Sequence, residues 1–153
     1  MKSNLSARRQ GGFTLVEILV TVVLISVGLL GIAALQLQTL RGNQEAYVRS
    51  QASVLSADIL DRMRANASAF RAGGYDAGYN GTGDTSTRAG QDLAEWQTTI
   101  NRTLPGGVEV AAGRVERVAA TQIVTITIRW RERATGDGTA NGGDREFRVR
   151  SEI

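Results

Sequence analysis

The sequence predicts an α+β fold in which a long N-terminal helix, first hydrophobic and then amphipathic, packs on a C-terminal antiparallel sheet. The helix is indicated by an uncharged run over residues 18–40, followed by apolar residues at helical spacing as far as Ala65. The sheet is indicated by two segments near the C-terminus in which apolar and polar residues alternate. Because helical and strand patterns are segregated along the chain, an α+β arrangement is favoured over alternating βα units.

We expect one helix from about Phe13 to Ala65. As a helix, residues 18–40 would be about 35 Å long, which is enough to cross a bilayer. Residues 15–35 have no polar face, and this excludes an ordinary core helix of a soluble protein. Residues 41–65 form its amphipathic part, whose apolar stripe would lie under a globular head. That stripe consists of Val48, Ala52, Leu55, Ile59 and Met63.

The middle of the chain predicts a loop followed by a short helix. Glycine, Ser/Thr, Asn and Asp follow one another through residues 66–90, as is typical of a loop. Residues 92–104 have helical spacing, with Asp92 near the start and Pro105 just beyond the end. Four apolar residues share one face of this helix: Leu93, Trp96, Ile100 and Leu104.

Residues 107–153 predict the antiparallel sheet. The weaker strand candidates are 108–112 and 114–119; the stronger ones, 122–133 and 145–153, would be antiparallel neighbours joined by a long loop. Seven residues would face inward and cover the apolar stripe of the helix: Val124, Ile126, Ile128, Trp130, Phe147, Val149 and Ile153.

The opposite face of this sheet would be rich in arginine. It would carry Arg129, Arg131, Arg133, Arg148 and Arg150. Such a face suggests either contacts with DNA or pairing with Glu132, Glu146 and Glu152, or a subunit interface. The three basic residues of the first twelve positions account for the whole net charge of +3, so the remainder is neutral. We therefore favour charge pairing or an interface and expect no nucleic-acid partner.

The composition argues against catalysis. The chain has no histidine and no cysteine, which excludes imidazole acid–base work, thiol nucleophiles and the usual zinc ligand sets. Oxygen-bearing side chains in the loop raise the alternative of calcium: Asp76, Asn80 and Asp84. Their spacing fits no calcium signature, and turn chemistry explains these residue types. We predict a non-enzyme without a cofactor or metal.

The N-terminus combines a basic leader with an acid in an apolar segment. The leader carries Lys2, Arg8 and Arg9. Glu17 is the only charge between Gly12 and Arg41, and an unpaired carboxylate in lipid costs several kcal/mol. A signal peptide cut near residues 31–34 and a simple single-pass anchor are the alternatives. Neither explains the Gly–Phe junction together with the acid.

The stretch GFTLVE, from Gly12 to Glu17, resembles the processing motif of type IV prepilins and of type II secretion pseudopilins. The resemblance implies cleavage between Gly12 and Phe13 by a prepilin peptidase, and N-methylation of Phe13. The amine of Phe13 would then pair with Glu17 of a neighbouring subunit. It also implies a type IV pilin-like fold. Residues 1–12 would be a removed leader, residues 13–40 a transmembrane and filament-core helix, and residues 41–153 a periplasmic head.

Within this family the chain is most similar to the PilV group of minor pilins. It lacks the proline that major pilins commonly carry near the position of Ala34, and it lacks the cysteines of their C-terminal disulfide. The resemblance implies an inner-membrane protein with a cytoplasmic N-terminus that later enters a surface pilus. Its partners would be other minor pilins, the major pilin, the peptidase and the assembly machinery. A minor pseudopilin and a single-pass membrane protein with a binding head are the alternatives.

Overall fold

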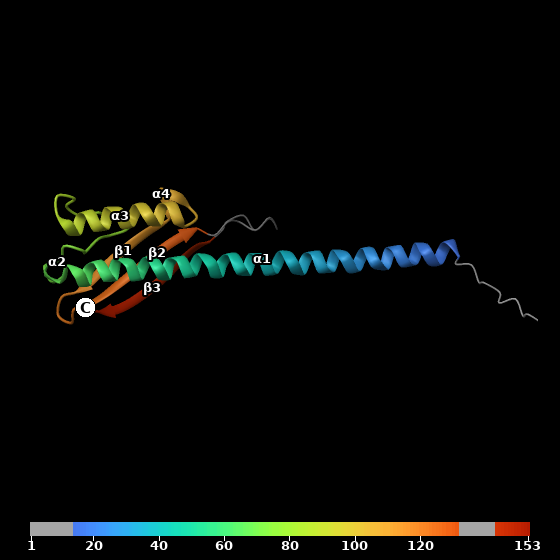
Figure 1. The fold of residues 1–153 in the computed structure, drawn as a ribbon, viewed down its shortest axis with the longest axis horizontal. Helices are drawn as coiled ribbons and strands as arrows, with labels where there is room; N and C mark the ends of the chain where they lie inside the picture. The colour runs from blue at the N-terminus through green and yellow to red at the C-terminus, as the bar shows by residue number, and fades with distance from the viewer. Residues whose placement is uncertain (1–13, 132–142) are drawn as a thin grey trace, which may run out of the picture. The chain divides into compact units, whose positions relative to one another are not determined.

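A single helix, α1 (Leu15–Ala65), dominates the computed structural model, which describes residues 14–131 and 143–153 (Figure 1). The structure divides into two units, residues 1–44 and 45–153, and α1 contributes to both. Its bounds agree with the helix that the sequence predicts over residues 13–65. Four residues named above lie outside the described ranges: Gly12, Phe13, Glu132 and Arg133.

In the first unit, every described residue of α1 is exposed. Three hydroxyl groups in this apolar stretch donate to the backbone carbonyl four residues earlier: Thr21 to Glu17 at 2.7 Å, Ser26 to Val22 at 2.7 Å and Thr39 to Leu35 at 3.0 Å. Such internal bonds satisfy polar groups without water, as a lipid environment requires.

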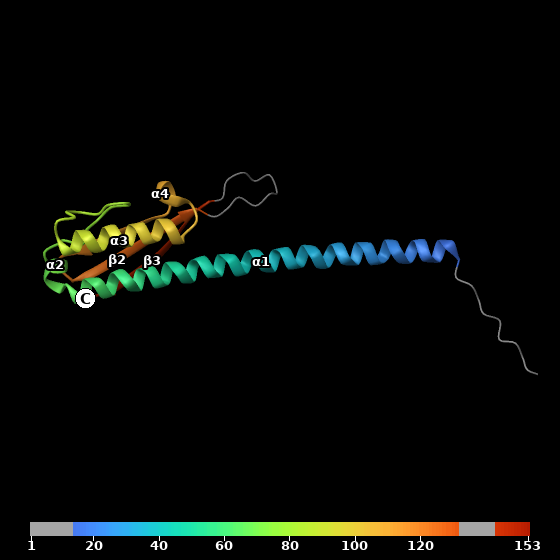
Figure 2. The same ribbon diagram turned by 45° about the horizontal axis from the view of Figure 1, so that its top comes forward.

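In the second unit, α1 and α3 (Arg88–Thr103) share a core with one face of the sheet. The predicted α1 stripe from Val48 to Met63 is buried, and so are the four apolar residues predicted for the second helix. The indole N–H of Trp96 donates to the carbonyl of Leu55 at 2.8 Å, which joins the two helices directly. Figure 2 shows α3 beside the C-terminal part of α1.

The sheet has three antiparallel strands in the order β1–β2–β3. They are β1 (Ala112–Val118), β2 (Ile123–Arg131) and β3 (Asp144–Glu152). The two strong strand predictions are confirmed as antiparallel neighbours. In the central strand, Ile126 lies opposite Val115 on one side and Val149 on the other. The predicted inward residues of β2 are buried, and those of β3 are partly buried against the core.

Two predictions for the region before the sheet are wrong. Residues 66–90 are not all loop, because they contain the short helix α2 (Ala67–Arg71). Moreover, α3 begins at Arg88 rather than Asp92, because the side-chain hydroxyl of Thr87 accepts the N–H of Gly90 at 3.1 Å and caps the helix there. One turn of helix therefore precedes Asp92, and this moves Asp92 from a helix start into a buried position.

Two strand predictions also need correction. Residues 107–110 form the short helix α4 (Gly107–Val110) where a strand was expected from Val108 to Ala112. Gly106 and Gly107 have φ values of 117° and 60°, which favour glycine and bend the chain before the sheet. Gly113 does not separate two strands, because β1 runs through it.

Gly113 is needed for the close packing of α3 on β1. A Cβ at this position would overlap the ring of Trp96 and lie 2.7 Å from Cδ1 of Ile100. The side-chain amide of Gln97 also bonds both backbone groups of Gly113: Nε2 donates to its carbonyl at 2.7 Å, and Oε1 accepts its N–H at 2.9 Å. The missing side chain thus allows the helix to approach the strand.

Candidate functional site

The first turn of α1 is organised by Thr14. The hydroxyl oxygen of Thr14 accepts the backbone N–H of Glu17 at 3.3 Å, and its carbonyl accepts the N–H of Ile18 at 3.3 Å. These two bonds are those of an N-cap residue, with Glu17 as the third residue of the helix. The sequence analysis missed this role, although a Thr followed three residues later by Glu is a recognised N-terminal signal.

Glu17 lies exposed in this first turn. Its carboxylate makes no hydrogen bond or ion pair with any residue of the described ranges, so its charge is available to a group outside them. The helix dipole stabilises an acid at this end by about 0.3–1 kcal/mol at an exposed site, which is far less than the cost of an unpaired charge in lipid. A cationic partner is therefore the more effective way to accommodate Glu17.

The apolar surface that follows Glu17 is too large for a helix facing water. Within the described residues, α1 has the length and hydropathy needed to cross a membrane: an 18-residue window reaches a mean hydropathy of 2.8, and none of that window is buried. Examples of exposed side chains are Leu19, Leu24 and Leu30, at 64%, 67% and 72%. A contiguous apolar surface of this size indicates contact with lipid or with other apolar segments.

The head contains a buried polar cluster around Asp92 that the sequence analysis did not predict. Asp92 is 2% exposed, and its Oδ2 accepts the hydroxyl of Tyr75 at 2.6 Å. Its Oδ1 lies 3.3 Å from Nη1 of Arg62 and 3.1 Å from Nε of Arg88. The cluster thereby joins α1, the loop after α2 and α3. Burial and the bond to Asp92 raise the pKa of Tyr75 to about 12.

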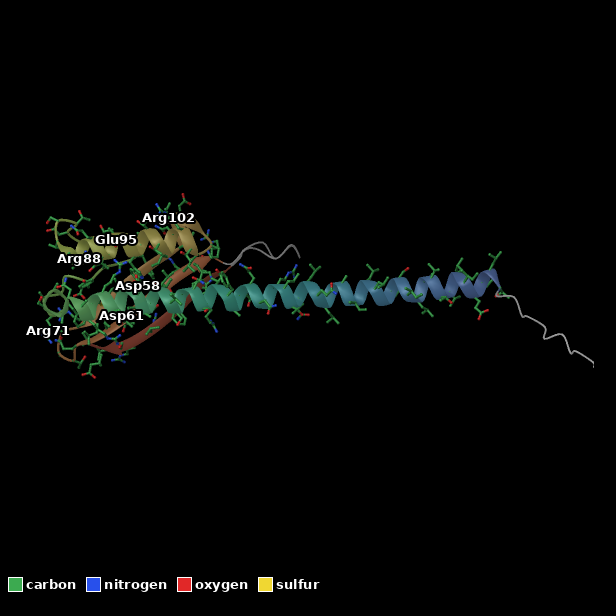
Figure 3. All side chains as sticks on the ribbon, viewed as in Figure 1. Asp58, Asp61, Arg71, Arg88, Glu95 and Arg102 are labelled. Carbon is green, nitrogen blue, oxygen red and sulfur yellow. The ribbon has the colours of Figure 1, made fainter. Side chains whose placement is uncertain are left out.

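Arg62 extends this cluster to the surface. It pairs with Asp58 on its own helix at 3.2 Å and with Glu95 of α3 at 2.8 Å; both acids are labelled in Figure 3. The hydrogen bond to Glu95 is the main reason that the pKa of Arg62 is raised. The expectation of a solvated charged face at these positions is therefore wrong for Arg62, because contacts from α3 were invisible in local periodicity.

The arginine-rich face is partly covered by an aromatic residue, contrary to the expectation of a face without aromatics. The ring of Tyr79 lies 4.2 Å from the guanidinium carbon of Arg129, and its hydroxyl donates to Glu146 at 2.9 Å. Charge pairing accounts for two further arginines, since Arg131 lies 3.0 Å from Asp144 and Arg148 lies 3.7 Å from Glu146. These contacts favour pairing within the sheet and leave a mixed-charge surface.

The loop oxygens considered for calcium do not converge in the described structure. Asp76 lies 3.7 Å from Arg117, and Asp84 accepts the backbone N–H of Ser86 at 2.9 Å. The hydrogen bond from Ser86 lowers the pKa of Asp84. Within the described residues, no group of three or more His, Cys, Asp or Glu side chains could hold a metal ion.

The comparison with family models gives one match. Residues 7–33 match the prokaryotic N-terminal methylation motif, and this segment contains Gly12, Phe13 and Glu17. No curated protein and no solved structure matches the chain. The motif indicates a type IV pilin or a pseudopilin, and it is typical of structural subunits that are processed and anchored in the inner membrane. The observed α+β architecture is consistent with the type IV pilin fold.

Proposed function

We propose that this protein is a minor type IV pilin, a structural subunit that joins other minor pilins in the inner membrane to prime pilus assembly at or near the tip. The observation that carries the proposal is the methylation motif at residues 7–33, which continues directly into the exposed apolar surface of α1. A single acid, Glu17, precedes that surface and has no partner in the described residues.

The proposed mechanism follows from charge. A prepilin peptidase cleaves between Gly12 and Phe13, and the cut creates a cationic α-amine at Phe13, which is then N-methylated. This amine pairs with Glu17 of a neighbouring subunit and neutralises it in an apolar environment. Because the contact joins different surfaces of successive subunits and does not close, it generates a helical filament. The apolar helix serves first as the membrane anchor and then as the filament core.

A minor rather than a major subunit is favoured by two departures from the major-pilin pattern. The proline is missing near Ala34, and the chain has no cysteine for a C-terminal disulfide. The buried cluster around Asp92 offers another way to join parts of the head. The placement of the head in the periplasm, the partnership with the major pilin and the PilV assignment remain predictions.

The experiment that tests the proposal follows the protein into filaments. Glu17→Ala and Glu17→Gln should leave the amount of membrane-inserted protein unchanged but strongly reduce the amount in sheared surface filaments. The matched control is Glu116→Gln, because Glu116 is an exposed acid of the head far along the chain from the motif. Normal incorporation of both Glu17 variants would overturn the proposed role of this carboxylate.

A minor pseudopilin of a type II secretion system is the second candidate, because the same motif serves both classes. Deletion of the gene distinguishes them: loss of surface filaments supports the pilin, whereas loss of exported enzymes with intact filaments supports the pseudopilin. A single-pass membrane protein with an independent head is favoured only if residues 1–12 are retained after membrane insertion.

A further inference from the structure

We infer that Thr14 is a positioning residue for Glu17, and that its hydroxyl group fixes the first turn of α1 so that the carboxylate can meet the amine of the neighbouring subunit. The inference rests on the proposed function, since it gives Thr14 a part in the same assembly contact. Thr14 touches Glu17 through the hydrogen bond from the Glu17 N–H to the Thr14 hydroxyl, at 3.3 Å.

The first argument concerns the unsatisfied donors of a helix. The first four backbone N–H groups of a helix lack partners within it, and in lipid no water is present to bind them. In α1 the Thr14 hydroxyl satisfies the N–H of Glu17 itself. Loss of this cap would loosen the turn that holds the Glu17 backbone, and the carboxylate would lose its fixed position.

The second argument is that Thr14 differs from the other threonines of the apolar segment. The hydroxyls of Thr21 and Thr39 donate to carbonyls four residues earlier, at 2.7 Å and 3.0 Å. Those two bonds lie inside the helix, where the backbone groups are already paired. Only at Thr14, among these three, does the hydroxyl accept a backbone N–H. The chain therefore offers two matched controls within one helix.

The third argument concerns the Glu17 side chain. Its carboxylate makes no contact with a residue of the described ranges, so no side-chain interaction there holds it in place. Its position depends on the backbone to which it is attached. A bond of about 1 kcal/mol at an N-cap, equivalent to about a fivefold change in population, is large enough to affect recruitment.

The test separates capping from shape. Thr14→Val keeps the shape of threonine but cannot accept a hydrogen bond, whereas Thr14→Ser and Thr14→Asn restore a cap with a different shape. We expect Thr14→Val to reduce the ratio of filament-incorporated to mature membrane protein by about fivefold. Thr14→Ser and Thr14→Asn should retain the wild-type ratio, as should Thr21→Val and Thr39→Val.

The readout is the amount of mature protein in sheared filaments divided by that in membranes of the same cells, so that a defect in cleavage does not count. A wild-type ratio for Thr14→Val would overturn the inference, and so would an equal loss in the serine and asparagine variants. If the wild-type protein is absent from filaments, or if Glu17→Gln enters them normally, the proposed function itself fails. The two failures are thus distinguishable.

Discussion

Gly113 is the residue whose side chain, or lack of one, most directly sets a distance in the head. Gly113→Ala would place a methyl group in the space of the Trp96 ring, and overpacking of this kind costs about 1–3 kcal/mol. We expect the free energy of unfolding of the detergent-solubilised chain to fall by that amount in urea denaturation. Gly78→Ala is the control, because a Cβ there meets nothing within 4 Å. Equal stability of the two variants would contradict the packing of α3 on β1.

Tyr75 predicts a pH dependence of stability. Its pKa is about 12 in the folded chain and near 10 when unfolded, so the protonated hydroxyl stabilises the fold. This contribution is complete below about pH 10 and is lost as the pH rises towards 12. Tyr75→Phe should therefore lower the free energy of unfolding by about 1–3 kcal/mol at pH 7 and flatten its decline above pH 10.

The control for this prediction is Tyr47→Phe, because Tyr47 is exposed on α1. It should reproduce the wild-type curve of unfolding free energy against pH. An unchanged decline above pH 10 in Tyr75→Phe would show that another group titrates in that window.

At the scale of elements, Arg62 connects α1 with α3. Arg62→Met removes its three carboxylate partners and leaves Asp92, which is 2% exposed, with Arg88 as its remaining cation. We expect a loss of about 1–3 kcal/mol in the free energy of unfolding. Arg64→Met, which breaks an exposed pair with Asp61, should change it by less than about 0.5 kcal/mol. Equal effects in urea denaturation would show that the Arg62 contacts are ordinary surface pairs.

The sequence predicted those elements whose pattern is long and local. Helix α1 and strands β2 and β3 have a sustained period, and their buried residues could be named in advance. The helices α2 and α4 are each of five residues or fewer, too short for a period to show. The early start of α3 depends on one hydroxyl, that of Thr87.

The candidate site was predictable in part for the same reason. The motif around Glu17 is contiguous, so its residue types and spacing could be read directly from the sequence. The contacts of Asp92 with Tyr75 and Arg62 join positions 17 and 30 residues apart, and no local pattern reports such pairs. The cap at Thr14 was visible in the sequence but was not recognised.

At the scale of the whole molecule, charge and the apolar segment agree in favouring an assembly subunit over a nucleic-acid binder. The net charge of +3 resides entirely in the first twelve residues, so removal of a leader there leaves a neutral chain. The arginine-rich face is partly neutralised by Asp144 and Glu146 and covered by Tyr79. No global electrostatic attraction to duplex DNA remains.

The central claim is that the N-terminal motif is processed and that the apolar helix stays attached. The most direct measurement is the intact mass of the chain purified from the membrane and from sheared filaments. We predict a single species that lacks residues 1–12 and begins with N-methylated Phe13, in both fractions. A chain that retains residues 1–12, or one cut after residues 31–34 and freed from its apolar segment, would contradict the account.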